Sequence, residues 1–484
     1  MLRGETINVA LNPIGAKQLR DAESFVPAQL ELRNGVRTDA GFWKGRPGAA
    51  QWWQTHAASP IILLIPRKWQ ADGNGFAVTS SGRIYELKTN RTVREYTGTT
   101  LNGDYRPTWC EFDGTIIITD GQAPVKIDAA GTTVSELSGS PPAAKYCAVI
   151  SDRVVLAGYD ATEFRWSDAG TSSTWTSTNV SNVTGHGEQI RYMTVANQDL
   201  YFFKDFSVEI WSHIGGNEVF GRKLIVTIAD KFSRNRGIPS FSVVQGPDGF
   251  YFFCDGDFWK LQGAQGTILS SAYKRELGNL EQVSTMYGFH CAKEHVIRWF
   301  EPVSARCFVY DYVNDVFTED NEWEFGEWQR LPMYSYMEVD GVAYMGDYDA
   351  SGLVYKWSDE VYSDDALPIR MQRKFRMPLT PKGLIRQGAS VEGHQARLNR
   401  LRLRFLRGQA GTGTAHTLSV RWALDEGDWT PYTELDLGEP GDADPWVDIH
   451  QLGVGREVKV EIVQAKNLPH VLTHALLTVQ PMGR

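Results

Sequence analysis

The sequence predicts an all-β protein in which a β-propeller of about seven blades is followed by a C-terminal β-sandwich. A pattern of short apolar strands and turns rich in Asp, Asn or Gly recurs seven times and stops after Asp365. The chain then continues as strands in which apolar and polar residues alternate. We therefore expect an extended N-terminal arm and a first strand in residues 1–50, the propeller in residues 51–368 and the sandwich in residues 369–484.

The composition is that of a packed globular protein. Of 484 residues, 42% are hydrophobic and 12% aromatic. The longest apolar run, "PIILLIP" at residues 60 to 66, has the length of a strand and falls short of the roughly 18 residues that cross a bilayer. The N-terminus has no apolar core of signal-peptide length, so we expect the protein to stay in the compartment of its synthesis and to enter no membrane.

The repeats have the length of four-stranded propeller blades. Each holds an apolar strand, a turn, a second apolar strand, another turn and an alternating strand, as in "PTWCEFDGTIIITDGQAPVKID". The turns before the second strand are spaced by 39, 39, 46, 50, 46 and 46 residues, at Gly75, Gly114, Arg153, Asp199, Gly249, His295 and Gly341. A single blade cannot bury both of its faces, so the repeats predict a ring. The variation in spacing also allows six or eight blades.

Asp-Gly pairs mark three of these turns, at residues 113–114, 248–249 and 340–341. A tight hairpin needs residues with positive φ, which Asp and especially Gly adopt at low cost. We therefore expect two-residue hairpin turns at these positions.

The third repeat contains "WSDAGTSSTW", which is close to the Asp-box turn of sialidases and other propellers. Ser167 and Asp168 are adjacent where that turn separates them, and Trp175 lies five residues after Gly170. The Asp of such a box accepts hydrogen bonds within its own turn, so we interpret the stretch as a structural turn rather than a glycan site. A second candidate, "ALDEGDW" at residues 423 to 429, lacks the Ser.

Five Cys residues lie far apart, each in an apolar or aromatic run: Cys110, Cys147, Cys254, Cys291 and Cys307. We expect all five to be reduced and buried, because nothing in the sequence suggests an oxidising compartment. His290 precedes Cys291, but no CxxC or HxxxH spacing surrounds this pair. We therefore expect no metal and no cofactor.

Charge is distributed unevenly along the chain. The net charge of -9 argues against a general nucleic-acid-binding protein. Residues 311 to 365 hold fifteen acidic and two basic residues, whereas residues 370 to 407 hold eleven basic residues and one acid. The two stretches suit opposite sides of a contact between subunits, although they are also suited to neutralise each other within one subunit.

The basic stretch supplies the candidate interface residues. In "LNRLRLRF", Leu401, Leu403 and Phe405 are expected to face a core, while the intervening Arg residues project from the other face. Such a row is either a solvated face or a contact surface for another subunit or an adaptor protein. The candidates are Arg370, Arg373, Lys374, Arg376, Arg397, Arg400, Arg402, Arg404 and Arg407.

The order of several motifs resembles one family. "GFWKGRPG" is followed by "DRVVLAGYDATEFRWSDAG" and "ANQDLYFFKDFSVEIW", and then by "RWALDEGDW" and "LGVGREVKVEI". This order resembles the tail hub or nozzle proteins of short-tailed bacteriophages, also called packaged-DNA stabilisation proteins. The resemblance implies a structural, non-enzymatic protein of the virion tail that is assembled in the host cytoplasm. It implies a ring, usually a hexamer, that lies below the portal and adaptor, closes the DNA channel, and docks fibres, spikes or a needle. Double-stranded DNA would then pass through the lumen without specific binding.

A propeller glycosidase or glycan-binding protein is the alternative, and a cellular propeller scaffold is a third hypothesis. Glu163, Asp168 and Glu188 could supply a pair of carboxylates for glycoside hydrolysis. A sialidase-type site would also need several Arg residues near the propeller axis, whereas the clustered Arg residues lie in the following domain. The chain contains no GxSxG, HExxH or P-loop motif and no paired CxxC.

Overall fold

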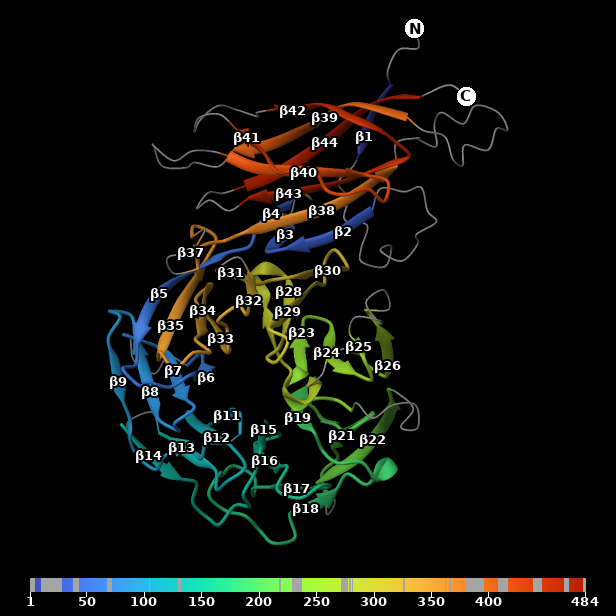
Figure 1. The fold of residues 1–484 in the computed structure, drawn as a ribbon. Coiled ribbons are helices and arrows are strands. Elements are labelled where there is room, and N and C mark those ends of the chain that lie inside the picture. Colours follow the sequence, from blue (N-terminus) through green and yellow to red (C-terminus); the bar gives the residue numbers. More distant parts are fainter. Residues whose placement is uncertain are drawn as a thin grey trace.

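Strands and turns form almost the whole protein (Figure 1). The computed structural model describes residues 5–9, 28–37, 43–67, 72–103, 105–128, 132–216, 219–228, 237–270, 277, 280, 282–324, 327–361, 363–364, 367–378, 396–407, 417–437, 446–464 and 470–481. No helix within these ranges is long and apolar enough to cross a membrane.

Seven sheets form the blades of a propeller, as the repeat predicts. Blade 1 contains β6 (Ile61–Ile65), β7 (Gly73–Thr79), β8 (Ile84–Lys88) and β9 (Val93–Glu95); blade 2 contains β11 (Thr108–Phe112), β12 (Thr115–Thr119), β13 (Val125–Ile127) and β14 (Thr133–Glu136), with β10 (Thr97–Gly98) at its edge. Blade 3 contains β15 (Tyr146–Ile150), β16 (Arg153–Ala157), β17 (Glu163–Trp166) and β18 (Val180–Asn182); blade 4 contains β19 (Tyr192–Ala196), β20 (Asp199–Phe203), β21 (Ser207–His213) and β22 (Phe220–Thr227).

The remaining blades follow in chain order. Blade 5 contains β23 (Val244–Gly246), β24 (Gly249–Cys254), β25 (Asp257–Gln262) and β26 (Gln265–Ile268); blade 6 contains β27 (Tyr287–Cys291), β28 (Val296–Glu301), β29 (Arg306–Asp311) and β30 (Val316–Glu319). Blade 7 contains β33 (Ser335–Val339), β34 (Val342–Gly346), β35 (Leu353–Ser358) and β5 (Gly48–Gln54), extended by β36 (Ser363–Asp364) and β37 (Leu367–Pro368). The connections hold the hairpin of β31 (Glu322–Glu324) and β32 (Glu327–Gln329) and the short 3-10 helices η2 (Gly185–Gly187), η3 (Ser240–Ser242), η5 (Val283–Thr285) and η6 (Ala292–Glu294).

Strand β5 closes the ring. It comes from the N-terminal part of the chain and pairs antiparallel with β35, so that Leu353 lies opposite Gln54. The last blade is therefore built from both ends of the propeller sequence. The propeller strands begin at Gly48, ahead of the boundary expected at residue 51.

A buried hydrophobic cluster fills each of the seven interfaces between neighbouring blades. Alternation along β20 shows how one strand supplies two of them: Leu200 and Phe202 face blade 3, whereas Tyr201 and Phe203 face blade 5. Side chains of this size each stabilise the fold by about 1.5–3 kcal/mol when fully buried. Blades are thus held by their neighbours.

The hairpin turns agree with the predicted Asp-Gly positions in two cases out of three. Residues 113–114 have φ of 46° and 73°, and residues 340–341 have φ of 51° and 72°. At residues 248–249 only the Gly has positive φ, at 156°. The same turn occurs without Gly at residues 151–152 and 197–198, where the φ values lie between 48° and 64°. Polar residues other than Gly therefore also adopt this turn.

The C-terminal domain contains two sheets around one core. The first is formed by β1 (Glu5–Val9), β3 (Gly35–Arg37), β4 (Trp43–Gly45), β39 (Ala396–Arg407), β42 (Trp446–Gly455) and β44 (His470–Pro481). The second contains β2 (Ala28–Arg33), β38 (Met371–Pro378), β40 (Thr417–Leu424), β41 (Thr433–Asp436) and β43 (Glu457–Gln464). A single hydrophobic cluster unites side chains of β39, β42 and β44 with those of β40 and β43.

The expected extended N-terminal arm is wrong for the described part of residues 1–50. Strands β1 and β4 pair with β44, and β2 pairs with β38, so these segments complete the C-terminal domain. Pairing satisfies the backbone groups that β38 and β44 would otherwise leave open at a sheet edge. Residues 1–4, 10–27 and 38–42 lie outside the described ranges.

One sheet runs from the propeller into the C-terminal domain. Strand β2 pairs with β38 on one side and, in parallel, with β30 of blade 6 on the other. The result is a nine-stranded sheet from β27 to β41. Figure 1 shows the C-terminal domain attached at the rim of the propeller beside β30.

Candidate functional site

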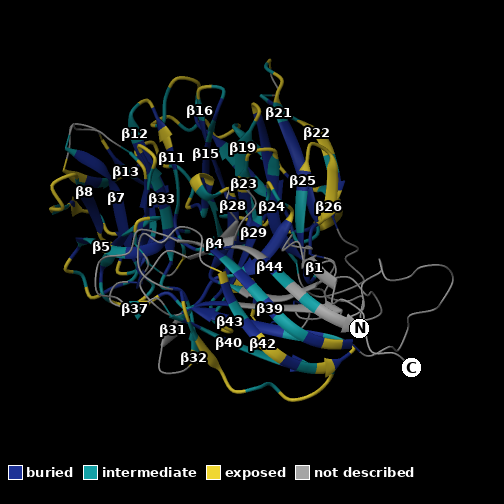
Figure 2. Ribbon diagram, turned by 90° about the horizontal axis from the view of Figure 1, so that it is seen from above, coloured by how far each residue is buried: buried dark blue, intermediate teal, exposed yellow. Residues whose placement is uncertain are grey.

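The predicted row of Arg residues lies on the outer face of β39. Leu401, Leu403 and Phe405 are buried in the core, as the alternation predicts. A bulge between Leu398 and Arg400 brings Arg397 onto the same outer face. Figure 2 shows buried and more exposed positions alternating along β39 and β42. We call Arg397, Arg400, Arg402 and Arg404 the β39 arginine row.

One acid and one aromatic ring organise this row. Asp448 of β42 accepts two hydrogen bonds from Arg402, at 2.8 and 3.0 Å, and lies 3.6 Å from the Nε of Arg400. The bond from Arg402 lowers the pKa of Asp448, and Arg400 contributes to the same shift. The guanidinium carbons of Arg402 and Arg404 lie 5.2 and 5.4 Å from the ring centre of Trp446. Arg397 is exposed.

The other candidates belong to the second sheet or lie outside the described side chains. Lys374 of β38 lies 3.9 Å from Glu461 of β43. Arg370 precedes β38, and burial lowers its pKa. The backbones of Arg373, Arg376 and Arg407 lie in β38 and β39, but their side chains are outside the described part. The described part of the basic stretch is therefore divided between two sheets.

The acidic stretch forms its described ion pairs with other segments. Asp359 pairs with Lys44, Glu319 with Arg306, and Asp320 with Arg298, while Asp364 pairs with Arg46. Arg400 and Arg402 pair with Asp448, outside the acidic stretch. Within the described residues, the two oppositely charged stretches therefore find partners elsewhere in the chain.

A buried network of charged side chains lies where the propeller meets the C-terminal domain. Arg46, which is 1% exposed, donates to both carboxylate oxygens of Asp364, with an Nη1 to Oδ1 distance of 2.9 Å. It also donates to the Oδ1 of Asn34 at 2.9 Å and to the carbonyls of Pro47 and Asn321 at 3.0 and 3.3 Å. Burial alone would lower the pKa of Arg46, but Asp364 outweighs it and raises the pKa.

Asn34 connects the parts of this network. Its backbone has φ of 55°, and its N–H donates to the carbonyl of Glu319 in blade 6 at 2.8 Å. Its side-chain amide donates to the carbonyl of Arg370 at 2.8 Å, and its Oδ1 also accepts from the N–H of Asn321 at 2.7 Å. One side chain thus holds the N-terminal segment, blade 6 and the start of the C-terminal domain together.

A second buried guanidinium extends the network. Arg298 donates to Asp320 at 2.9 Å and to both oxygens of Glu294 at 3.1 and 2.7 Å. The ring of Trp357 lies 5.2 Å from Arg298 and 5.3 Å from Arg46, and its N–H donates to Glu294 at 2.6 Å. We call this set the junction network: Asn34, Arg46, Glu294, Arg298, Asp320, Asn321, Trp357 and Asp364.

The motif "GRPG" has its place here. Gly48 approaches the carbonyl oxygens of Val361 and Ser363 so closely that a Cβ would lie 2.5 Å from each. Pro47 is buried between Arg46 and Gly48. The sequence predicts this stretch as part of an extended arm. An Arg that stands between Gly45 and Pro47 gives little indication of a buried ion pair.

A cavity of about 250 Å³ lies on the propeller axis. Figure 1 shows the first strands of the blades nearest to this axis. Six blades contribute to its wall through Leu64 of β6, Thr108 of β11, Cys147 of β15, Thr194 of β19, Phe289 of β27 and Ser335 of β33, and Val243 extends it toward blade 5. We call it the axial cavity.

Arg106 crosses the axis at this cavity. It precedes β11, and its Nη2 donates to the carbonyl of Tyr334 in front of blade 7. Its guanidinium carbon lies 4.5 Å from the ring centre of Tyr287, 4.9 Å from Tyr334, 5.3 Å from Phe289 and 5.9 Å from Phe241. Its Nη1 is buried and has no acceptor within the described part of the chain. Burial lowers the pKa of Arg106, and the nearby Tyr hydroxyls offset only part of this shift.

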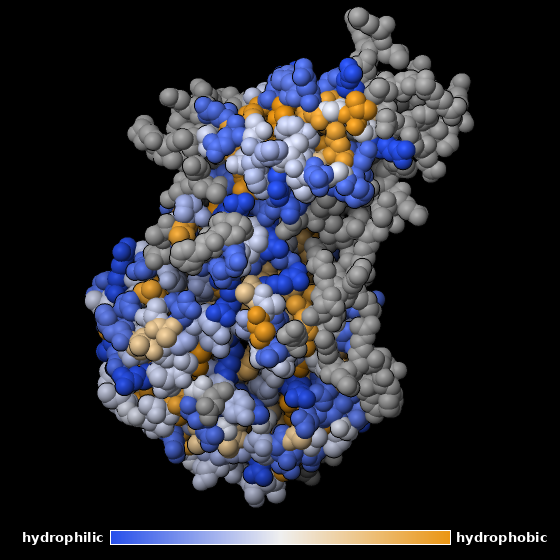
Figure 3. Space-filling model, in the orientation of Figure 1, coloured by the Kyte–Doolittle hydropathy of each residue, from blue (hydrophilic) through white to orange (hydrophobic). Residues whose placement is uncertain are grey.

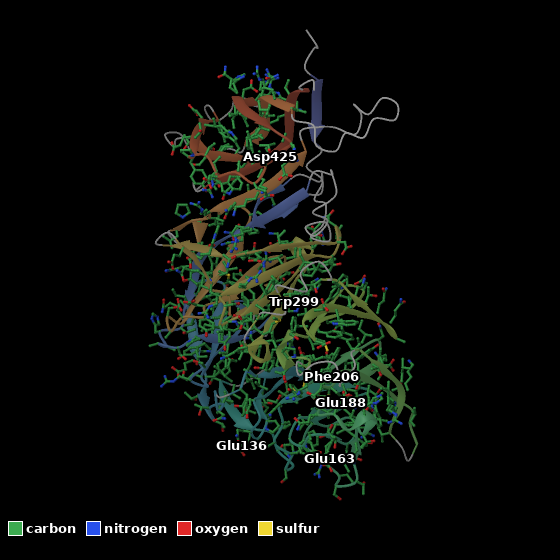
Figure 4. All side chains as sticks on the ribbon, turned by 45° about the vertical axis from the view of Figure 1, so that its right-hand side comes forward. Glu136, Glu163, Glu188, Phe206, Trp299 and Asp425 are labelled. Atoms are coloured by element: carbon green, nitrogen blue, oxygen red, sulfur yellow. The ribbon has the colours of Figure 1, made fainter. Side chains whose placement is uncertain are left out.

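The acids considered for glycoside hydrolysis each have a local structural partner. Glu163 accepts from the hydroxyl of Tyr159 at 3.0 Å, and Asp168 accepts from Thr176 and Asn179 at 3.0 and 2.7 Å. Glu188 holds the loop of Phe206, because the Oε2 of Glu188 accepts a hydrogen bond from the N–H of Phe206 at 3.1 Å (Figure 4). Asp168 thus stabilises its own turn, although through side chains rather than backbone N–H groups.

Asp425, in the second Asp-box candidate, also has a structural role. It has φ of 52°, and its Oδ1 accepts from the N–H groups of Arg456 and Glu457 at 2.6 and 3.0 Å (Figure 4). The turn therefore connects the end of β40 to the start of β43.

All five Cys residues are buried, as predicted, and the structure has them as free thiols. Burial raises the pKa of Cys291 to about 12, and Cys254 and Cys307 are shifted in the same direction for the same reason. The described residues contain no cluster of three or more His, Cys, Asp or Glu side chains that could hold a metal ion.

Comparison with known proteins shows structural likeness at low identity. No family model and no curated protein matches the chain. BamB from Moraxella catarrhalis is 12% identical, with a TM-score of 0.40, over 69% of this chain and 100% of its own. PorZ of Porphyromonas gingivalis is 11% identical, with a TM-score of 0.40, over 73% of this chain and 44% of its own. The N-terminal domain of Nup159 is 10% identical, with a TM-score of 0.39, over 67% of this chain and 97% of its own.

Proposed function

We propose that this chain is the hub or nozzle subunit of a short-tailed bacteriophage tail and that six copies form a ring below the portal and adaptor. The observation that carries this proposal is the connection between the domains. "GFWKGRPG", the first motif of the family resemblance, contains Arg46 and Gly48 of the junction. Together with the nine-stranded sheet, this junction makes the propeller and the C-terminal domain one continuous body. A subunit that transmits load along a tail needs such continuity.

The β39 arginine row suits the contact between subunits or with the adaptor. Strands β39, β42 and β44 lie at the end of the C-terminal domain that is farther from the propeller (Figure 1). The surface view has hydrophilic atoms along this outermost edge (Figure 3). A ring requires a heterologous interface, in which one patch meets a different patch of the neighbour. A row of Arg side chains on a rigid strand offers one such patch, and fibres, spikes or a needle would dock elsewhere.

In this proposal DNA passes through the lumen that the ring encloses. The axial cavity of one propeller, at about 250 Å³, has the scale of a small-molecule pocket and is too small for a duplex. The lumen should be neutral or acidic, because many cationic contacts to phosphate would trap the duplex and slow ejection. The net charge of -9 agrees with this requirement.

Electron microscopy of the purified full-length protein tests the proposal. We expect rings with a central channel, alone or after addition of portal and adaptor proteins, and mass photometry should give about six subunits. A protein that stays monomeric with these partners would contradict it. A panel of glycans tests the competing class, because turnover of a glycan by the monomer would favour a propeller glycosidase.

A further inference from the structure

Arg106 is a buried cation whose charge is not matched by an acid. No ion pair with a carboxylate is formed by Arg106 within the described residues, and its Nη1 has no acceptor there. Its surroundings are aromatic rings and one backbone carbonyl. A propeller does not need such a residue to close its ring, because the inter-blade clusters do so.

Aromatic faces offset only part of the cost of burying a guanidinium. The π-systems of Tyr287 and Tyr334 attract the cation, but they accept no strong hydrogen bond from Nη1. A buried donor without a partner is costly, and a buried charge more so. Arg106 also lines the axial cavity, which is large enough for several waters at roughly 30 Å³ each or for one small organic molecule.

We propose that the axial cavity binds a small organic carboxylate, whose charged group pairs with Arg106 and whose apolar body lies among the inward-facing aromatic side chains. A carboxylate presents two coplanar oxygens, which match the planar fork of a guanidinium. Phe289, Phe241 and Leu64 of the wall suit an apolar or aromatic body, and Thr108, Thr194 and Ser335 add polar groups beside them. This inference does not depend on a role in a phage tail.

The charge and shape of the site favour a carboxylate over inorganic phosphate. A single guanidinium neutralises one negative charge, whereas phosphate at neutral pH carries more than one and needs additional donors. Phosphate also has no apolar body to fill the remaining space. A neutral ligand of the same shape would still accept a hydrogen bond from Nη1, but it would leave the positive charge of the guanidinium without a counter-charge.

Isothermal titration calorimetry of the full-length protein tests the site with benzoate as the probe and benzamide as its neutral analogue. We expect benzoate to bind once per chain and benzamide at least tenfold more weakly. The Arg106→Met variant should bind benzoate at least tenfold more weakly, and Arg106→Lys should fall between the two. Arg165→Met is the matched control, because Arg165 also stacks on a tyrosine, Tyr159, at 5.7 Å, but does not line the cavity.

A second pair of variants keeps Arg106 in place. Thr194→Glu supplies a carboxylate from the cavity wall and should abolish benzoate binding, whereas Thr194→Gln, of nearly the same size, should retain it. Several results would overturn the proposal: no benzoate binding by the folded protein, equal binding of benzamide, unchanged binding by Arg106→Met, or phosphate binding more tightly than benzoate.

Discussion

Arg46 at the domain junction and Arg106 at the propeller axis are both buried beside aromatic rings, yet their surroundings differ in one respect. Arg46 at the junction stacks near Trp357 and donates to Asp364, Asn34 and two carbonyls. Arg106 at the axis stacks near several rings but donates to a single carbonyl. The acceptors of the first cation come from its own chain, whereas the described residues leave the Nη1 of the second without an acceptor.

This difference separates a structural role from a binding role. A buried cation with a complete set of acceptors cannot lose its partner without leaving a charge behind, so the fold depends on the pair. A buried cation without an acid contributes little to stability and keeps its donor for a ligand. The opposite pKa shifts agree, because the pKa of Arg46 is raised by Asp364 against burial, while that of Arg106 is lowered by burial.

The largest effect should follow from removing the junction cation. We expect Arg46→Ala to lower the free energy of unfolding by about 3–5 kcal/mol, because it leaves the carboxylate of Asp364 buried and unpaired. Arg106→Met, which removes an unpaired cation, should change it far less. Equilibrium unfolding in urea measures both, and equal losses in the two variants would contradict the comparison.

A double variant at the junction should recover part of this loss. When Asp364 is also replaced, as in Arg46→Met with Asp364→Leu, no isolated charge remains in the buried site. We expect a coupling free energy of roughly 0.5–3 kcal/mol between the two substitutions. If the losses in the free energy of unfolding are additive, the ion pair between Arg46 and Asp364 is not the reason why the single substitution of Arg46 destabilises the protein.

Sequence patterns predict the propeller well because their signals are local. Each hairpin is encoded within a few residues, as at 113–114, and the alternation in β39 correctly separates Leu401 from Arg402. Pairings between distant segments have no such signal, so the strands of the supposed N-terminal arm were missed. The same reason hides both buried arginines, since the partners of Arg46 lie 12 to 318 residues away along the chain, apart from Pro47.

Arg106 has even less to distinguish it in the sequence. It lies in the loop before β11, next to a Pro, and its aromatic neighbours come from blade 6 and from the segments before blades 5 and 7. Only the closed ring brings these side chains together on the axis.

The β39 arginine row extends the comparison to cations that are partly exposed in the single chain, with 35% and 33% of the side chains of Arg400 and Arg402 accessible. We expect replacement of Arg400, Arg402 and Arg404 by Glu to weaken ring or adaptor association more than it lowers the melting temperature, because surface charge pairs contribute little to folding. Mass photometry and thermal melting measure the two effects.

The matched control reverses three charges on the propeller surface, at Arg83, Arg191 and Arg222, whose side chains are 53%, 44% and 45% exposed. These changes should leave assembly intact. Intact rings together with a large melting loss in the β39 variant would make the row structural.

The buried thiols should resist modification in the folded protein. Burial raises the pKa of Cys291 to about 12, so this group stays protonated at neutral pH and is a poor nucleophile. We expect a maleimide to leave Cys254, Cys291 and Cys307 unlabelled in the native state and to label all five Cys residues in urea, as measured by intact mass. A native mass that is two hydrogens short for a disulfide would contradict the expected reduced state.

The smallest expected effect concerns DNA binding, because the proposal requires that the ring has no affinity for duplex DNA. A protein that neutralises several phosphates binds duplex with an affinity that falls steeply as salt rises, and such binding would hold the duplex in the lumen. We therefore expect no measurable duplex affinity of the assembled ring at physiological salt. A salt titration of duplex binding, with the β39 charge-reversal variant beside the parent, decides the location of the row. If the parent protein binds duplex and the variant does not, the β39 arginine row contacts DNA. The row would then be part of the lumen wall rather than an interface with other proteins.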